Sequence, residues 1–352
     1  MARVTLEAIA RPEGVRFRDT QIEMAHGAGG KASRRLVEGL IAPYFANSVL
    51  AQLGDAALLA IGGAPLALSA DGFVVRPLAF PGGSIGDLAV NGTVNDLAVA
   101  GARPVALLTT LILEAGLPAS VLEREIAAMA RAAQRAGIAI VGGDTKVVEH
   151  GLADGMYVST FGVGSVDARA NLGAERVRAG DKVLVSGPIG DHGITILLAR
   201  GELELEADLI SDTQPVWSHV DALLDASGES VRWMRDPTRG GVATALNELA
   251  RACRLGIALL EDAVPVRATV RGACEILGLD PLHIANEGRF LAVVAAEAAE
   301  AALAALHASG APQAAIVGEI RSEPAGSVVG INGYGGARMV DMLVGDPLPR
   351  IC

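Results

Sequence analysis

The segment from Pro81 to Pro104 constrains the fold most, because it joins a glycine-rich turn to a helix that is apolar except along one stripe. It reads PGGSIGDLAVNGTVNDLAVAGARP. Asp87, Asn91 and Asn95 are spaced four residues apart and therefore share one helix face. The alternative is a helix whose polar face meets solvent, but the flanking Ala, Val, Gly and Leu residues favour burial. Buried amides and carboxylates need partners, so we expect polar groups opposite the stripe and a binding site in this region.

Length and composition favour an enzyme-sized chain of two domains. The 352 residues can form two separate cores. Hydrophobic residues make up 51% but aromatic residues only 3%, so Ala, Val, Leu and Ile must fill those cores. A formal charge of -11 disfavours binding to nucleic acids and to anionic membranes. A bound nucleotide would depend on backbone donors, a few basic side chains and metal ions.

No feature of the sequence indicates export, membrane insertion or structural zinc. The amino-terminal MARVTLEAIARPEG lacks the long apolar run of a signal peptide. The three cysteines, Cys253, Cys274 and Cys352, form no CxxC pair and no zinc spacing. Cys253 and Cys274 fall on apolar helix faces and are interpreted as buried small hydrophobes. We therefore expect a soluble cytoplasmic protein.

The pattern of elements predicts an α/β (α+β) fold with an amino-terminal domain over 1–168, a carboxy-terminal domain over 169–344 and a flexible tail over 345–352. A polar connector over 171–181 separates the two domains. The expected helices cover 32–40, 119–135 and 194–200, and the expected strands cover 105–113, 138–141, 156–163 and 182–186.

Several glycine-rich segments are candidates for binding phosphate. The loop MAHGAGGK contains Gly27, Gly29 and Gly30 and precedes a predicted helix, whose amino terminus favours an anion. Its spacing differs from that of a Walker loop, and a mobile loop fits the pattern equally well. GPIGDHG and DPTRGG also lead into helices, but this is how many strand–helix connections look.

Four aspartates of the first half are predicted to lie near turns or glycine-rich junctions: Asp55, Asp71, Asp96 and Asp144. Single aspartates often form turns, but four together are typical of a magnesium site, because Mg²⁺ prefers hard oxygen ligands. Asp144 lies in GGDTK, next to Gly143, Thr145 and Lys146, which suggests a nucleoside triphosphate. In the second half, ANEGR places Glu287 beside Arg289 before a predicted strand.

The segments GDLAVNGTVNDLAVAGARP, GGDTK, GDHG, DPTRGG, ANEGR and the terminal PRIC together resemble the HypE family of hydrogenase maturation proteins, within the aminoimidazole ribonucleotide synthetase-like superfamily. The resemblance covers nearly the whole chain. It implies a two-domain PurM-like fold, a homodimer formed through the amino-terminal sheet, and ATP bound with Mg²⁺ in the cleft between the domains. Most of these motifs belong to the superfamily, whereas the terminal PRIC singles out this family.

The resemblance also implies roles for individual residues. Asp55, Asp71, Asp96 and Asp144 would surround magnesium and phosphates, and the loop around Gly27 to Gly30 would cover the nucleotide. The remaining cofactor-binding candidates are Asp87, Asn91, Gly143 and Thr145. Lys146 and Glu287 fall where the family has residues important for the reaction. The number of metal ions stays open.

The chain ends in Cys352, which follows Pro347 and Pro349. We interpret this end as an extended arm that cannot join a core. The arm from Gly345 can span at most about 25–29 Å, enough to carry a thiol between a cleft and a partner's surface. The adjacent terminal carboxylate disfavours the thiolate of Cys352, and Arg350 partly offsets this effect.

The activity implied by the resemblance is that of an ATP-dependent carbamoyl dehydratase, a lyase acting on its own Cys352. The carbamoyltransferase HypF would load a carboxamide on the sulfur, Lys146 would neutralise charge during phosphoryl transfer, and Glu287 would act as a base. The resulting cyanide would pass to iron on a HypC–HypD scaffold complex. Two alternatives remain: a superfamily kinase or synthetase acting on a free small molecule, and a non-catalytic thiol carrier.

Overall fold

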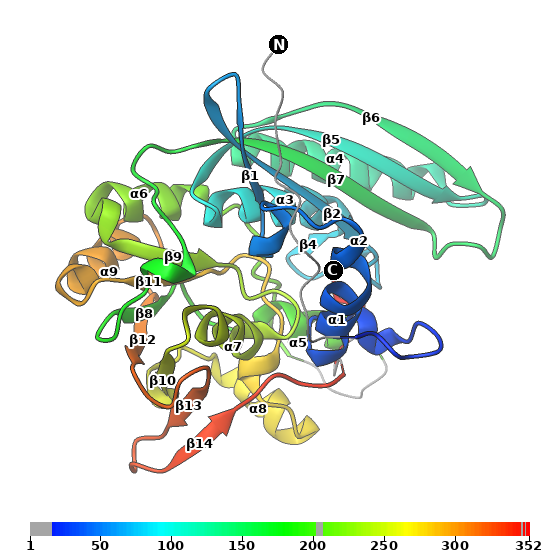
Figure 1. Ribbon diagram of the computed structural model, residues 1–352. Helices are drawn as coiled ribbons and strands as arrows, with labels where there is room; N and C mark the ends of the chain where they lie inside the picture. The colour runs from blue at the N-terminus through cyan, green and yellow to red at the C-terminus, as the bar shows by residue number, and fades with distance from the viewer. Residues whose placement is uncertain (1–15, 202–206, 346–347, 349) are drawn as a thin grey trace.

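The computed structural model describes residues 16–201, 207–345, 348 and 350–352, and these residues form two β-sheets with helices packed on them (Figure 1). No helix in this part of the chain is long and apolar enough to cross a membrane. The first sheet ends at Val166 and the second begins at Lys182. The predicted domain boundary at 168/169 falls between the two sheets.

The first sheet has five strands in the order β1-β2-β7-β5-β6. It is antiparallel apart from the parallel pair β5–β6. Helices α3 and α4 cover one face of it (Figure 1), while the opposite face exposes apolar side chains that include Val105, Leu108 and Phe161. The elements are β1 (Ala57–Ile61), β2 (Ala64–Phe73), α3 (Ile85–Val99), β5 (Ala102–Glu114), α4 (Ala119–Ala136), β6 (Ala139–Val148) and β7 (Met156–Val166).

The second sheet has seven strands in the order β14-β13-β10-β12-β8-β11-β9. Its strands are β8 (Lys182–Val185), β9 (Val231–Arg235), β10 (Gly256–Leu260), β11 (Leu291–Val294), β12 (Ala315–Arg321), β13 (Val328–Ile331) and β14 (Ala337–Val340). Its helices are α5 (Asp191–Ala199), α6 (Trp217–Ser227), α7 (Gly241–Cys253), α8 (Ala268–Leu277) and α9 (Ala299–Ala308). Apolar residues of α7 form one cluster with strand residues of this sheet, and apolar residues of α6 and α9 form a second cluster with others. The sheet is therefore buried on both faces.

Short elements complete the described chain. A strand pair, β3 (Ala79–Phe80) and β4 (Gly83–Ser84), leads into α3. The amino-terminal region forms α1 (Lys31–Leu36), a π-helical turn (Val37–Ile41) and α2 (Ala42–Tyr44). Single 3-10 turns cover Met24–Gly27, Leu50–Gln52, Ala174–Arg176, Gly228–Ser230, Glu261–Ala263, Pro281–His283 and Ala296–Ala298.

Helix α3 is the central element, and its sequence explains why it fits there. Two glycines permit close packing: a side chain at Gly86 would collide with the Glu125 backbone of α4, and one at Gly92 would lie 2.8 Å from the Phe73 ring. Asn91 and Asn95 are 0% and 1% exposed, which confirms the predicted burial of the polar stripe. The helix is therefore held between α4 and β2, with its amides pointing at the second domain's residues described below.

Candidate functional site

The carboxylates of Asp55, Asp96 and Asp236 form the centre of the candidate site, with one oxygen atom of each lying within 4.8 Å of the others. Asp55 precedes β1, Asp96 belongs to α3 and Asp236 directly follows β9, so both domains contribute. Asp71 on β2 shares a hydrogen bond with Asp96. Ser69 Oγ, also on β2, donates to Asp96 Oδ2 at 2.5 Å.

These carboxyl groups repel one another in a buried setting. Burial raises the pKa of Asp96 and Asp236 well above the ordinary value, and neighbouring carboxylates raise both further. Burial also raises the pKa of Asp55, although Arg235 opposes this shift. The Arg235 Nε atom lies 2.9 Å from Asp55 Oδ1, and its Nη1 lies 2.8 Å from Glu248 Oε2. One guanidinium thus balances only part of the negative charge.

The acidic cluster lines a cavity of about 210 Å³ that also takes in the start of α7 and the glycine loop. Gly29 has a φ of +77°, and a side chain there would lie 2.6 Å from Arg239. Arg239 Nη1 donates to the Gly27 carbonyl at 3.0 Å. The glycine loop therefore lies against the Asp236–Gly241 segment and closes one side of the cavity.

The donor set fits a divalent cation such as Mg²⁺. Three carboxylates converge, with Asp236 buried and Asp55 and Asp96 half-buried, and their mutual repulsion would be relieved by a bound cation. Asp55, Asp96 and Asp236 are the residues that would hold it, with Asp71 beside them.

The polar stripe of α3 meets the segment over 211–216 of the second domain. Asn91 Nδ2 donates to Thr213 Oγ1 at 3.0 Å. Asn95 Nδ2 donates to the carbonyls of Gln214 and Glu287, and its Oδ1 accepts from the Val216 amide at 2.9 Å. The predicted polar partners are therefore present, and they join the two domains.

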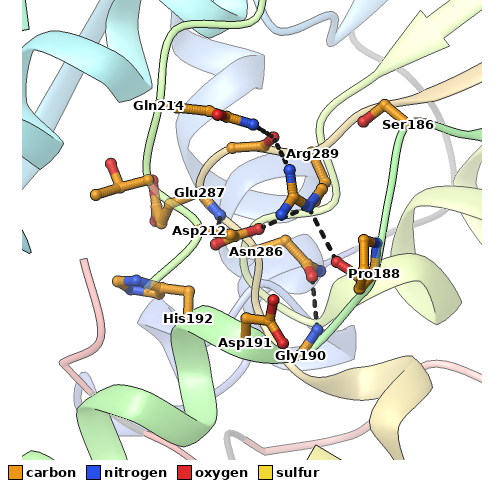
Figure 2. Close-up of polar contacts among 12 residues, drawn as sticks. Ser186, Pro188, Gly190, Asp191, His192, Asp212, Gln214, Asn286, Glu287 and Arg289 are labelled. Carbon is orange, nitrogen blue, oxygen red and sulfur yellow. Dashed lines mark hydrogen bonds and ion pairs between the residues drawn. The ribbon is translucent and has the colours of Figure 1, made fainter. Parts of the chain in front are cut away.

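Glu287 lies in a buried polar cluster beside this stripe (Figure 2). Glu287 is 4% exposed. Burial, together with the nearby carboxylates of Asp236 and Asp212, raises the pKa of Glu287 well above the ordinary value. Its amide donates to Asp212 Oδ1 at 3.1 Å. Next to it, Asn286 Oδ1 accepts from the Gly190 amide at 2.8 Å. A buried carboxyl of this kind can exchange protons nearer to neutral pH than an exposed one.

The described residues of the tail are docked on the protein, and the prediction that the tail cannot join a core is wrong. Leu348 and Ile351 are each 3% exposed and belong to a hydrophobic cluster that spans both domains. The Val74 amide donates to a terminal carboxylate oxygen of Cys352 at 2.9 Å, and the Arg76 amide donates to the Arg350 carbonyl at 3.2 Å. The chain end thus packs against residues of both domains.

Comparison with known proteins agrees with this geometry. Residues 53–166 match the AIR synthase related protein N-terminal domain and residues 178–331 match its C-terminal domain. The chain is 48% identical over 339 residues to carbamoyl dehydratase HypE of Azotobacter vinelandii, covering 96% of this chain and 98% of the relative. With HypE of Rhodobacter capsulatus it shares 50% identity over 340 residues, 96% of this chain and 99% of the relative. This chain belongs to the HypE family of carbamoyl dehydratases.

Solved structures of the HypE family have the same fold. A HypE–HypF complex aligns with a TM-score of 0.83 and 41% identity, covering 88% of this chain and 99% of the other. A HypE structure in complex with ATP aligns with a TM-score of 0.79 and 46% identity, covering 94% and 99%. The two-domain fold expected from the sequence is thus confirmed, as are the role in hydrogenase maturation and the enzyme class.

Within one chain, several predicted site residues lie apart from the acidic cavity. Gly143, Asp144, Thr145 and Lys146 belong to β6, where they are exposed, and Lys146 Nζ lies 2.8 Å from Asp144 Oδ2. That ion pair lowers the pKa of Asp144. Asp87 pairs instead with Arg135 of α4 at 2.8 Å. The positions near turns that we expected for Asp71, Asp96 and Asp144 are wrong, because they lie inside β2, α3 and β6.

Asp236, Arg235 and His192 were not predicted to belong to the site. DPTRGG contains Asp236, but a single aspartate before a proline is also an ordinary turn former. His192 of GDHG lies within hydrogen-bonding distance of the tail, with Nε2 2.7 Å from the Ile351 carbonyl oxygen. Neither role could be recognised without knowing which segments the fold brings together.

Proposed function

We propose that this protein uses ATP to dehydrate a carboxamide carried on the sulfur of Cys352, which gives a thiocyanate. Its cyanide would become a ligand of the iron in a [NiFe]-hydrogenase. The observation that carries this proposal is the docked tail. A terminal carboxylate oxygen of Cys352 accepts from the Val74 amide, and Val74 is three residues along the chain from Asp71 of the acidic cavity. Three extended residues span about 10 Å, so the sulfur-bearing residue lies near the cavity.

The cavity suits the triphosphate of ATP with its metal. Asp55, Asp96 and Asp236 would hold Mg²⁺, which when bound neutralises charge on the transferring phosphoryl group. The amino terminus of α7 and Gly29 line the same cavity, and a helix amino terminus favours an anion. A relative in the same family, solved in complex with ATP, supports this assignment.

The chemistry removes one oxygen and two protons from the carboxamide. The amide oxygen attacks the γ-phosphorus, the bond from that phosphorus to ADP breaks, and one nitrogen proton is lost. The C–O bond then breaks with loss of the second proton, so phosphate leaves carrying the former amide oxygen and the carbon–nitrogen triple bond forms. ATP is needed because an unactivated amide oxygen is a poor leaving group. Glu287 is the candidate base for these protons, since it is buried beside the cavity and its pKa is raised.

A homodimer would give Lys146 access to the reaction. The open face of the first sheet exposes Val105, Leu108 and Phe161, an apolar surface that a second copy can cover. Lys146 lies on the edge strand β6 of that sheet and away from its own chain's cavity. We infer that each chain presents Lys146, with Gly143, Asp144 and Thr145, to the cavity of its partner.

The tail also has to meet other proteins. HypF is the carbamoyltransferase proposed to load Cys352, in line with the solved HypE–HypF complex of relatives. A HypC–HypD scaffold complex is proposed to accept the cyanide. Both steps require the tail to leave its docked position.

The decisive experiment measures the intact mass of the carbamoylated protein before and after addition of ATP and Mg²⁺. We expect the loss of the mass of one water, confined to the carboxy-terminal peptide. Cys352→Ser should abolish loading, and Glu287→Gln should retain the carboxamide. ATP hydrolysis with an unchanged tail mass in the unaltered protein would overturn the proposal and favour a kinase acting on a free molecule.

A further inference from the structure

His192 is a completely buried histidine that connects the tail to the segment over 211–216 of the second domain. It occupies the second position of α5, and its residue is 0% exposed. Its Nε2 atom lies 2.7 Å from the Ile351 carbonyl oxygen, and its Nδ1 atom lies 2.8 Å from Ser211 Oγ. It therefore touches the residue immediately before Cys352.

The two contacts determine the protonation of the ring. A carbonyl oxygen can only accept, so Nε2 must carry the hydrogen and donate it to Ile351. In a neutral imidazole Nδ1 is then an acceptor, which requires Ser211 to donate its hydroxyl hydrogen. The Ser211 oxygen in turn accepts from the Thr213 amide at 3.2 Å. Every partner in this chain thus has one consistent role.

The surroundings keep the ring neutral and fixed. The Phe80 ring packs edge-on against it, with centroids 5.7 Å apart and an interplanar angle of 81°. Burial lowers the pKa of His192 to about 4. The neighbouring Asp191 points to Arg267, whose Nε lies 2.8 Å from Asp191 Oδ2. His192 is therefore a neutral donor over the whole physiological pH range.

The Ile351 carbonyl needs such a donor. The Ile351 side chain is inserted into the apolar cluster between the domains, which carries its backbone away from water. A buried carbonyl without a partner would cost free energy. Without the Nε2 hydrogen of His192, the Ile351 carbonyl would lose its hydrogen bond, and the docked position of the tail would lose stability.

The segment that orients His192 also holds the candidate base. Ser211 contacts the ring, Asp212 Oδ1 accepts from the Glu287 amide at 3.1 Å, and Thr213 Oγ1 accepts from Asn91 of α3. Figure 2 shows His192, Asp212 and Glu287 grouped in one region of the cluster. The three residues 211–213 therefore relate the tail, the base and the central helix to one another.

We propose that His192 is a positioning residue for the reaction proposed above: oriented by Ser211, it fixes the Ile351 carbonyl and thereby sets where the Cys352 sulfur sits relative to Glu287. That the position of the sulfur matters for catalysis rests on the proposed function, whereas the docking of the tail can be measured without any turnover. It concerns the orientation of the tail and assigns His192 no contact with the reacting atoms.

Hydrogen exchange of the Val74 and Arg76 amides in the full-length protein tests the docking, because both donate to backbone oxygens of the tail. A chain lacking residues 348–352 defines the undocked rate. His192→Leu should accelerate exchange about 5- to 10-fold, the loss of one hydrogen bond to a buried carbonyl. His192→Gln places a donor near the Nε2 position and should stay within about 2-fold of the unaltered protein. Ser211→Ala should give an intermediate rate.

His219→Leu is the matched control. His219 is also buried and also bonds a serine through Nδ1, at 2.8 Å from Ser309 Oγ, yet it belongs to α6. Its replacement should leave the exchange of Val74 and Arg76 unchanged. Equal acceleration by His219→Leu, or normal protection in a folded His192→Leu, would overturn the positioning role.

Single-turnover formation of the thiocyanate separates this proposal from the function itself. We expect His192→Leu to slow dehydration about 10-fold or more with an unchanged KM for ATP, and His192→Gln to recover most of the rate. If the unaltered protein forms thiocyanate and His192→Leu matches it, the positioning role fails alone. If the unaltered protein forms none, the proposed function fails, whatever the exchange rates are.

Discussion

The carboxylates in the acidic cavity repel one another, and a bound cation would relieve this repulsion. Asp55, Asp96 and Asp236 bring three carboxylates within 4.8 Å, and Arg235 offsets only part of their charge. Selection for ligand binding explains why such a destabilising arrangement persists at the junction of two domains. The stability of the protein should therefore respond to these residues in the opposite direction from most buried positions.

Asp96→Asn tests this directly. Removing one negative charge from the cluster should raise the melting temperature of the metal-free protein by about 2–4 °C, equivalent to about 1 kcal/mol. The same change should abolish the stabilisation that Mg²⁺ gives the unaltered protein. Differential scanning calorimetry with and without Mg²⁺ measures both effects.

Asp87→Asn is the control for that experiment. Asp87 lies on the same helix but pairs with Arg135 outside the cavity. Its variant should lose stability slightly and keep its full response to Mg²⁺. A normal Mg²⁺ response in Asp96→Asn would contradict the assignment of the metal ligands.

The histidine that holds the tail makes a prediction about pH. The pKa of His192 is about 4 in the folded protein and 6.5 as the ordinary value, so the unfolded chain binds the extra proton between these values. Folding stability is therefore lost as the pH falls through this window. Going from about pH 8 to about pH 5.5 should cost the unaltered protein about 1.4 kcal/mol from this group.

The raised pKa values of the buried carboxyl groups change stability in the opposite sense, but they do so equally in the unaltered protein and in His192→Gln. Comparing the two proteins therefore isolates the contribution of His192. Urea denaturation at the two pH values should show a smaller loss of stability in the variant. An identical pH response of the two proteins would contradict a neutral, buried His192.

At the scale of elements, α3 and the segment over 211–216 act as the connection between the domains. Asn95 alone makes three hydrogen bonds across this contact, to Gln214, Glu287 and Val216. Replacing it by alanine should leave several buried polar groups without partners. We expect Asn95→Ala to cost about 3–5 kcal/mol and to separate thermal unfolding into two transitions.

Asn247→Ala provides the comparison. Asn247 is equally buried and bonds two carbonyls, of Ala243 and Val340, but all of these contacts stay within the second domain. Its variant should lower stability without uncoupling the domains. Calorimetry that gives one transition for both variants would argue against the connecting role of α3.

The same elements show what could be predicted from the sequence. The burial of α3 followed from polar residues at four-residue spacing among small apolar ones, a pattern that depends on local sequence alone. The strand that continues through GGDTK was not predicted. A side chain at Gly143 would collide with the Thr109 carbonyl, so the glycine marks the close approach of β5 and β6 and not the end of a strand.

The docked tail could not be predicted either. Its eight residues carry no periodicity, and the two prolines are typical of an exposed extended arm. Its binding site includes Val74, Arg76 and His192, which lie between 159 and 278 positions away from the tail residues they contact. Long-range pairing of this kind is decided by the tertiary fold and leaves no local signal.

At the scale of the whole molecule, the inferred dimer makes a prediction by complementation. Asp96→Asn and Lys146→Ala should each be inactive alone. If Lys146 serves the partner's cavity, mixed dimers contain one intact site, and equal mixing should restore roughly a quarter of the activity by statistical assembly. The dehydration assay on the refolded mixture measures this.

Lys146 acting on its own chain would give a different result, because neither chain of a mixed dimer would then hold an intact site. No recovery despite verified subunit exchange would overturn the inferred arrangement. Recovery that depends on mixing would establish that the protein is a dimer and that Lys146 of β6 serves the cavity of the partner chain.

The docking of the chain's own end has a kinetic consequence. A tethered reactant is presented at a local concentration on the order of millimolar or above, however dilute the protein is. Dehydration should therefore be first order in the loaded protein, and a free peptide with the same last residues should compete poorly. The rate of cyanide supply would then depend on how often the tail undocks to meet other proteins and docks again, a property of its contacts with Val74 and Arg76 more than of the ATP cavity.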